Sequence, residues 1–262
     1  MNELQQRILS YYKKHGRDLP WRRTTNRYHI MVAEVMLQQT QVSRVLPKYE
    51  AWIIQFPTVQ ALAEAPLREV LARWSGLGYN SRGKRLQDAA KIIVSQYGGE
   101  VPSSVDKLLS LPGIGPYTAR SILIFADNKD IATVDTNIRR ILIHELQLEE
   151  HTSDKELFAH AQTLLPTGRS REWHNALMDY GARILTSRKT GIKAKTKQST
   201  FKHSRRYYRG QILKLLTQKE TITRKRLQQL YSDCPYDLQT LLDELRAEGI
   251  LVKKNRSYLI RE

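Results

Sequence analysis

Apolar side chains recur at spacings of three and four residues through the first 180 residues, in short runs that glycine and proline interrupt. Two of these runs begin at Leu4 and at Val59. This spacing places the apolar side chains on one face of a helix, and each glycine or proline ends a run before it grows long. Strand-like alternation is scarce in this part of the chain. The pattern therefore predicts an all-α body built of many short helices.

The composition of the chain changes near residue 181. From Ala182 to Lys219 there is no acidic residue, whereas lysine and arginine recur throughout. Within this region, residues 186–202 are polar and lack apolar periodicity, which is typical of a linker. The linker is either a solvated tether or an arm that binds phosphate groups, and the pattern favours neither.

The last sixty residues again carry apolar helix faces. These lie at 208–216, 227–231 and 238–245, and two short apolar segments at 250–252 and 258–260 follow them, separated by a basic turn. Three helices and a β-hairpin with a basic turn are typical of a winged helix. We therefore expect a small winged-helix-like α+β domain, which binds either DNA or another protein.

The net charge narrows the class of partner. The sequence has 43 Lys and Arg against 26 Asp and Glu, a formal net charge of +17. Such an excess favours a polyanionic partner, and DNA, RNA and an acidic membrane surface all qualify. No stretch reaches the ~20 consecutive apolar residues that span a bilayer, and the polar N-terminus lacks the apolar segment of a signal peptide. We therefore expect an intracellular protein, cytoplasmic and nucleoid-associated if prokaryotic, with no membrane segment, and the charge alone does not choose among the three polyanions.

The segment 111–119 has the sequence Leu-Pro-Gly-Ile-Gly-Pro-Tyr-Thr-Ala. Gly113 and Gly115 allow a tight turn with exposed backbone N–H groups, and a helix begins immediately afterwards. This geometry suits the binding of a phosphate by amides and a helix N-terminus. Many helix connections use Gly-x-Gly for steric reasons alone, but the whole segment resembles the hairpin of helix-hairpin-helix DNA-binding proteins.

Two carboxylates are candidates for catalysis. Glu34 lies in an almost unbroken apolar run, where a carboxylate must pair, reach the surface or become protonated with a raised pKa. A raised pKa suits a general acid, and a solvated surface position is the alternative. Asp135 precedes a helix-like segment, so it is either an N-cap, which the local sequence favours, or a carboxylate that stabilises positive charge in a cleft. The amide side chains of Gln38, Gln39 and Gln41, which follow Glu34, can form hydrogen bonds with the edges of DNA bases.

In their order and spacing these segments resemble the helix-hairpin-helix DNA glycosylase superfamily, and within it the MutY-like A/G-specific adenine glycosylases. The matching segments are Leu19–Arg22, Glu34–Val42, Phe56–Val59, Trp74–Tyr79, 111–119, Val134–Asn137 and Met178–Ala182. The resemblance implies a two-lobed helical glycosylase domain over 1–185, with a lobe boundary near 22 and 131 and the hairpin at 111–119. The basic linker at 186–202 and the winged-helix-like domain at 203–262 would follow.

The resemblance assigns catalytic roles to four residues. Glu34 would be the general acid that protonates the adenine leaving group, and Asp135 would stabilise the oxocarbenium-like sugar, as paired carboxylates do in glycoside hydrolysis. Asn137 would support the carboxylates by hydrogen bonding. Tyr117 stands where lyase-active relatives carry lysine, so no Schiff base with the sugar and no efficient strand cleavage are expected.

The resemblance and the charge pattern also predict the DNA contacts. The partner would be double-stranded DNA with a mismatch or a damaged base, bound by a monomer. Gln38, Gln39 and Thr40 would lie at the flipped base and its partner, and Tyr79 would wedge the base stack. The glycines of the hairpin would bind the phosphate beside the lesion, with a monovalent cation on carbonyls near Leu111 and Gly113. The full set of predicted DNA-binding residues is Gln38, Gln39, Thr40, Tyr79, Arg82, Gly113, Gly115, Lys193, Lys195 and Lys197.

The chain departs from the family pattern in two ways. Relatives carry four cysteines after the Met-Asp-x-Gly-Ala segment, spaced for a [4Fe–4S] cluster, but Leu185 stands where the first would fall and Cys234 is the single cysteine of the chain. We therefore expect no iron–sulfur cluster, no side-chain metal site and no cofactor, and lysines of the linker would replace lost phosphate contacts. Such relatives also often add a Nudix-like domain that senses 8-oxoguanine, whereas residues 203–262 resemble a winged helix, so the preferred base opposite adenine stays open.

Two other functions remain open from the sequence. A glycosylase of the same fold could remove thymine or uracil opposite G, although the Gln38–Gln41 segment favours adenine. A non-enzymatic DNA-binding regulator would combine an inactive glycosylase fold with a functional winged helix. The joint presence of Glu34, Tyr117 and Asp135 argues against such decay.

Overall fold

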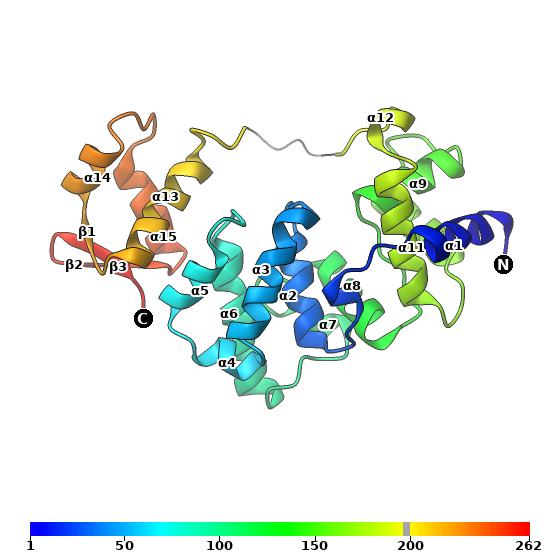
Figure 1. Ribbon diagram of the computed structural model, residues 1–262, viewed down its shortest axis with the longest axis horizontal. Coiled ribbons are helices and arrows are strands. Elements are labelled where there is room, and N and C mark those ends of the chain that lie inside the picture. The colour runs from blue at the N-terminus through cyan, green and yellow to red at the C-terminus, as the bar shows by residue number, and fades with distance from the viewer. Residues whose placement is uncertain (196–199) are drawn as a thin grey trace. The chain divides into compact units, whose positions relative to one another are not determined.

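The computed structural model describes residues 1–195 and 200–262 (Figure 1). These residues form fifteen α-helices, one short 3₁₀ helix and a three-stranded sheet near the C-terminus. The predicted all-α body followed by a small α+β domain is confirmed. None of the helices in these two ranges has the length and apolarity that a membrane crossing needs.

The helices of the predicted glycosylase domain are short, as the spacing of glycine and proline predicts. They are α1 (Glu3–His15), η1 (Pro20–Arg22), α2 (Arg27–Leu37), α3 (Val42–Gln55), α4 (Val59–Glu64), α5 (Leu67–Trp74), α6 (Ser81–Tyr97), α7 (Val105–Leu109), α8 (Pro116–Asp127), α9 (Thr136–Glu145), α10 (Asp154–Thr163) and α11 (Ser170–Arg183).

The chain forms two compact units. Unit 1 comprises 1–34, 103–110 and the described part of 114–197, and unit 2 comprises 35–102, 111–113 and the described residues after 197. The predicted lobe boundary near 22 and 131 concerns the glycosylase domain alone and stays a prediction, because unit 2 also includes the C-terminal domain. The two units divide at 34 and near 102–114, and α8 belongs to unit 1 because it packs against α7 and α11.

Unit 1 has a core formed by α1, α9, α10 and α11. Ile8, Ile138, Leu157 and Trp173 are among its buried side chains. Two of its helices begin with a capping box, in which Asn2 caps α1 and Ser153 caps α10. Each box satisfies N–H groups that the first turn leaves without partners, so the helix starts are encoded locally while the apolar faces hold the unit together.

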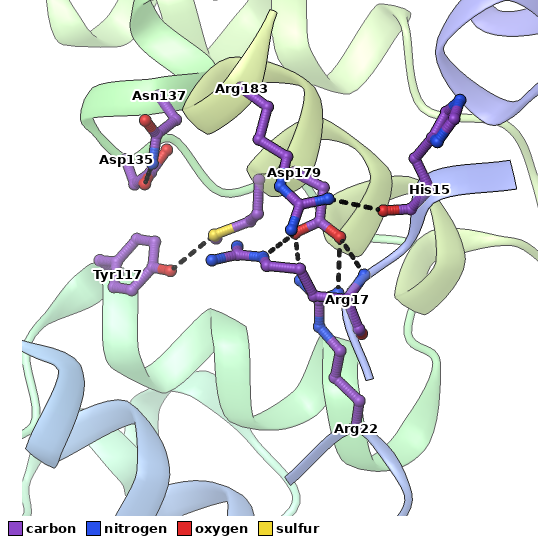
Figure 2. Close-up of polar contacts among 9 residues, drawn as sticks. His15, Arg17, Arg22, Tyr117, Asp135, Asn137, Asp179 and Arg183 are labelled. Carbon is purple, nitrogen blue, oxygen red and sulfur yellow. Dashed lines mark hydrogen bonds and ion pairs between the residues drawn. The ribbon is translucent and has the colours of Figure 1, made fainter. Parts of the chain in front are cut away.

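One buried carboxylate fixes the segment between α1 and α2 to α11. Asp179 is fully buried and accepts hydrogen bonds from the backbone and Nε of Arg17, at 2.8 and 2.6 Å, and from both terminal nitrogens of Arg22, at 2.9 and 2.8 Å (Figure 2). Burial alone would raise the pKa of Asp179, but these bonds hold it below its usual value. The Met-Asp-Tyr-Gly segment is therefore a structural anchor.

Unit 2 packs α3, α4, α5 and α6 around a cluster of large side chains. Trp52 and Trp74 are fully buried and meet edge to face, with ring centroids 5.6 Å apart. Gly83 on α6 faces this cluster, since a Cβ there would lie 2.9 Å from the Trp74 ring. The close approach of α6 to Trp74 therefore depends on a glycine.

The C-terminal residues form the predicted winged-helix-like domain. Its elements are α13 (Arg205–Gln218), β1 (Ile222–Thr223), α14 (Arg224–Leu230), α15 (Leu238–Ala247), β2 (Leu251–Lys254) and β3 (Ser257–Ile260). The three helices and the hairpin are those predicted. The short strand β1 was missed because two residues show no alternation; it pairs antiparallel with β3, giving the order β1-β3-β2.

The predicted linker at 186–202 is only partly a linker. Its start forms α12 (Ser187–Thr190), capped by Thr186, and Ile192 is buried in the core of unit 1. Arg139 also donates to the carbonyl of Lys193 at 3.2 Å. The stretch shows no periodicity because a single apolar side chain, Ile192, attaches it.

Candidate active site and DNA-contacting residues

Glu34 is buried on α2, with 6% of its surface exposed. Its neighbours Val32, Ala33, Val35 and Met36 are buried as well, so the carboxylate lies in an apolar environment. Burial, together with the negative charge of Asp135, raises the pKa of Glu34 to about 7. The structure thus gives Glu34 the raised pKa that the sequence left as one of three possibilities. At neutral pH, Glu34 is therefore protonated in a large fraction of the molecules.

Asp135 is both a helix cap and a member of the site. One carboxylate oxygen accepts from the backbone N–H of Ile138 at 2.7 Å and so caps α9. The other oxygen accepts from Nδ2 of Asn137 at 3.0 Å (Figure 2). Burial raises the pKa of Asp135, while these two donors favour the ionised form and limit the rise. The cap fixes the carboxylate in place, so the two readings of the sequence are compatible.

Tyr117 contributes a neutral hydroxyl to the same group. It lies in the first turn of α8, and Ser121 lies one turn later on the same face. The two hydroxyls lower the pKa of Glu34 and so offset part of the effect of burial. Burial and the charges of Glu34 and Asp135 raise the pKa of Tyr117 well above 10, so it stays protonated. Its hydroxyl also lies 4.0 Å from the sulfur of Met178 (Figure 2).

Arg140 is a supporting residue that the sequence analysis missed. Its terminal nitrogen donates to Oδ1 of Asn137 at 2.7 Å and to the carbonyl of Gly181 at 2.8 Å, and its Nε donates to the carbonyl of Leu185. Because Arg140 holds Oδ1, the Asn137 amide presents Nδ2 to Asp135. Gly181 permits this packing, since a Cβ there would lie 2.8 Å from the Cβ of Asn137.

His174 is a second supporting residue without a sequence signal. Its Nδ1 lies 2.8 Å from the carbonyl of Ser170, and its Nε2 accepts from the backbone N–H of Thr133 at 3.2 Å. Burial lowers the pKa of His174 to about 4, so the ring is neutral and can accept that bond. Thr133 comes two residues before Asp135, and the histidine therefore anchors the segment that leads to the carboxylate.

An open depression of about 730 Å³ adjoins these groups in unit 1. Asp135 and Tyr117 line it, together with Arg120, Phe158 and Lys195. The depression thus places a carboxylate, an aromatic side chain and cations around one space. The cations suit an anionic ligand, and the aromatic side chain suits a flat ring. The carboxylate suits a part of the ligand that develops positive charge.

The residues predicted to contact the flipped base lie in a turn of unit 2. Gln39 has a φ of +53°, and Nε2 of Gln38 donates to the carbonyl of Gly113 at 3.4 Å. The Thr40 hydroxyl donates to the Gln38 and Leu77 carbonyls, at 3.2 and 3.4 Å. The turn therefore connects the hairpin to the segment that precedes Tyr79.

The structure places Arg82, one of the predicted DNA-binding residues, inside unit 2 and gives its guanidinium group partners within the protein. Arg82 is buried, and one terminal nitrogen donates to the carbonyls of Val35, Met36 and Gln38 at 2.8, 3.1 and 2.5 Å. The other donates to the Thr40 hydroxyl at 3.0 Å and to the carbonyls of Leu77 and Gly78 at 3.3 and 3.1 Å. Burial lowers its pKa to about 10. Arg82 instead holds the turns at 38–40 and 77–79 together.

The two glycines of the hairpin have different conformations. Gly113 has a φ of +81°, and a Cβ there would lie 3.1 Å from Cβ of Arg85, so glycine is required. Gly115 caps α8 with an ordinary φ of −94°, and a Cβ would meet nothing within 4 Å. Its missing side chain instead leaves the first turn of α8 open to a ligand that contacts the backbone.

The predicted lysine arm divides into three cases. Lys193 is exposed, while Lys195 forms an ion pair with Asp154 and lines the depression beside Asp135. Lys197 lies outside the described residues. The arm is therefore anchored to unit 1 through 195 rather than tethered freely.

The residues that follow α11 do not fit a [4Fe–4S] cluster. Leu185 and Ile192 pack into the core of unit 1, and Arg140 binds the Leu185 carbonyl. An iron–sulfur cluster needs thiolate ligands, and the chain has one cysteine, Cys234, in the C-terminal domain. Within the described residues, no group of three His, Cys, Asp or Glu side chains is arranged to bind a metal.

Comparison with known proteins agrees with this fold. The model of the HhH-GPD superfamily of base excision DNA repair proteins matches residues 32–167. An adenine DNA glycosylase of Mycolicibacterium smegmatis is 37% identical over 266 aligned residues, which cover 93% of this chain and 91% of that protein. The human adenine DNA glycosylase is 39% identical over 192 residues, 68% of this chain but 35% of the human one. The structure of a thermostable thymine-DNA glycosylase has a TM-score of 0.68 and 30% sequence identity, covering 71% of this chain and 88% of that one.

The chain therefore belongs to the HhH-GPD superfamily, and its class is DNA N-glycosylase of base excision repair. Within that superfamily it is a homologue of the adenine DNA glycosylases. The resemblance inferred from the motifs is thus confirmed.

Proposed function

We propose that the protein hydrolyses the N-glycosidic bond of adenine mispaired with G or 8-oxoguanine in double-stranded DNA. The observation that carries the proposal is the buried Glu34, whose pKa is raised to about 7 beside Asp135. A carboxyl group whose pKa is raised toward neutrality, next to a second carboxyl group that accepts hydrogen bonds from Ile138 and Asn137, is the arrangement that glycoside hydrolysis requires. The similarity to adenine DNA glycosylases supports adenine as the base removed.

In the proposed reaction, Glu34 gives its proton to the adenine ring as the bond from the sugar to the base breaks. The bonding electrons leave with the base, and the sugar becomes oxocarbenium-like. Asp135 stabilises this cation, and Asn137 and Arg140 keep its carboxylate in position. Water then adds to the sugar, and its proton passes to the Glu34 carboxylate, which restores the acid. Asn137 is a positioning residue because it acts through Asp135.

The product is an abasic site in an unbroken strand. Tyr117 has no amine, so no Schiff base forms with the sugar at this position. Borohydride should therefore trap no covalent complex between the wild-type protein and DNA.

The test is a single-turnover assay on four duplexes that contain A:8-oxoguanine, A:G, T:G or U:G. We expect base loss from the two adenine duplexes, and loss of excision by at least about a hundredfold in both Glu34→Gln and Asp135→Asn. Excision of thymine or uracil alone would establish the second candidate, which the likeness to a thymine-DNA glycosylase favours. Full activity of either variant would contradict the mechanism, and wild-type protein that binds but removes no base would be a regulator.

A further inference from the structure

Unit 2 contains a groove of about 500 Å³ between a turn of the helical body and the first helix of the C-terminal domain. The turn at 75–80, which includes Tyr79, forms one wall, and α13 forms the other with Arg206, Tyr207 and Lys214. The segment Trp74–Tyr79 of the glycosylase domain supplies Tyr79, whereas α13 is the first helix of the C-terminal domain. The groove therefore depends on how the C-terminal domain packs within this unit.

Specific contacts attach α13 to this wall. Arg68 on α5 donates to the carbonyls of Leu216 and Lys219 at the end of α13, at 2.8 and 3.2 Å. At the other end, the Arg206 guanidinium donates to the Tyr79 hydroxyl and lies 4.7 Å from the centroid of its ring. A cation over an aromatic face holds that ring in a defined orientation.

The helical wall of the groove has an unusual backbone. Gln39 and Tyr79 have φ values of +53° and +47°, a region that bulky side chains rarely adopt. The buried Arg82 guanidinium stabilises both turns, because it donates hydrogen bonds to the carbonyls of Gln38, Leu77 and Gly78. Strained residues that the surrounding structure over-determines cluster at ligand-binding sites.

The side chains of the groove are suited to a nucleic acid strand. Arg44, Arg206 and Lys214 line it, and none of the described residues that line it is acidic. Two aromatic side chains also lie there: Phe201, which is 53% exposed, and Tyr207, which meets it edge to face. Cations bind phosphates and aromatic faces stack on bases. Through Gln38 and the carbonyl of Gly113, this wall is also connected to the hairpin.

We infer that this groove binds the DNA strand that carries the base opposite the excised adenine. Through α13, the C-terminal domain thereby takes part in the recognition of the mispair. The inference rests on the proposed function, since the strand that carries the adenine must bind at Glu34 and Asp135 in unit 1. The depression lined by Asp135 in unit 1 and the groove lined by Arg206 in unit 2 share no lining residue, so a substitution in the groove leaves the lining of the depression unchanged.

The experiment compares two double variants. The groove variant carries Arg206→Ala and Lys214→Ala together, and the control carries Lys225→Ala and Arg226→Ala together. The control removes the same charge from exposed positions of α14 outside the groove. Hydroxyl-radical footprints are recorded on each strand of an A:G duplex, and dissociation constants are measured at several salt concentrations. Circular dichroism confirms that each variant folds. If the double variant does not fold, Lys214→Ala alone removes one charge of the groove and keeps the contact of Arg206 with Tyr79, and half of the change in salt slope is then expected.

We expect the groove variant to lose protection of the G strand while it keeps protection of the A strand. Its affinity should fall about tenfold at 0.1 M salt, and the salt slope should decrease by about two, whereas the control remains within about twofold of the wild type. Unchanged protection of the G strand, or equal loss on both strands, would overturn the inference. The footprint needs no base excision, so failure of the proposed function is detected separately by the excision assay.

Discussion

At the scale of single residues, the site depends on how burial distributes protons. Glu34 and His174 are both enclosed, but burial raises the pKa of the carboxyl to about 7 and lowers that of the imidazole to about 4. Both shifts favour the neutral form, because a charge loses its hydration when it is buried. Glu34 is thereby suited to donate a proton, and His174 to accept a hydrogen bond from the backbone.

The pKa of Glu34 predicts the pH dependence of excision. The general acid must be protonated, so the single-turnover rate should fall as pH rises through about 7. The Tyr117 hydroxyl lowers this pKa, and Tyr117→Phe should therefore move the alkaline limb to higher pH, whatever its effect on the maximal rate. Rate profiles of the two proteins between pH 5 and 9 would check this. A limb that stays in place, or moves down, would contradict the assigned contact.

The buried His174 predicts a pH dependence of stability. Its pKa is about 4 in the folded protein and near 6.5 when unfolded, so the unfolded chain binds more protons between these values. The free energy of unfolding should therefore decrease as pH falls from 6.5 to 4, by about 3 kcal/mol for this group. Denaturant titrations of His174→Gln should show a shallower decrease than the wild type. Parallel profiles would show that the histidine does not titrate in this range.

At the scale of elements, the hairpin separates two uses of glycine. Gly113 needs its left-handed backbone and the space beside Arg85, whereas Gly115 needs neither and starts α8. One glycine therefore shapes the turn, and the other leaves the backbone open to a phosphate. The same Gly-x-Gly sequence thus serves folding at one position and binding at the next.

This difference predicts opposite phenotypes for two matched substitutions. Gly113→Ala should lower the free energy of unfolding by more than about 1 kcal/mol because of its positive φ. Gly115→Ala should change the free energy of unfolding by less than that. It should weaken DNA binding, because the methyl group would occupy the space at the first turn of α8 where the phosphate would bind. Chemical denaturation and fluorescence anisotropy measure the two effects. A Gly115→Ala protein that binds DNA as well as the wild type would contradict a phosphate contact at this turn.

At the scale of the whole molecule, the charge of +17 is not a uniform coat. Part of it is engaged within the protein, since Arg17 and Arg22 bind Asp179, and Arg82 and Arg140 bind carbonyl groups. Lys195 pairs with the exposed carboxylate of Asp154. The cations that remain at the surface, such as Lys193, are those available to DNA.

Charge reversal of Lys193, Lys195 and Lys197 should weaken DNA binding and reduce its salt dependence. Each lost phosphate contact removes about 0.9 from the slope of log K against log salt, and the pairing of Lys195 with Asp154 should make its share the smaller. Anisotropy titrations between 50 and 200 mM salt would measure this, with Lys225→Glu and Arg226→Glu at exposed positions of α14 as the control. Unchanged binding of the triple variant would exclude a phosphate-binding arm.

The sequence by itself determined the local features of this protein. The short helices, the hairpin at 111–119, the cap at Asp135 and the β-hairpin after Gly249 all follow from side chains within a few residues of each other. Glu34 was a candidate acid because its own neighbours are apolar. Family motifs extended these local patterns to a function.

Only the tertiary structure decided which charged groups are buried and what they bind. Arg82 was predicted to bind DNA, but it binds carbonyls more than forty residues earlier in the chain, from Val35 to Gln38. Arg140 and His174 support the site through equally distant partners, at Gly181 and Thr133. A basic side chain has the same sequence pattern whether it faces water or a ring of carbonyls, because the difference lies in the desolvation that distant segments impose when they pack around it.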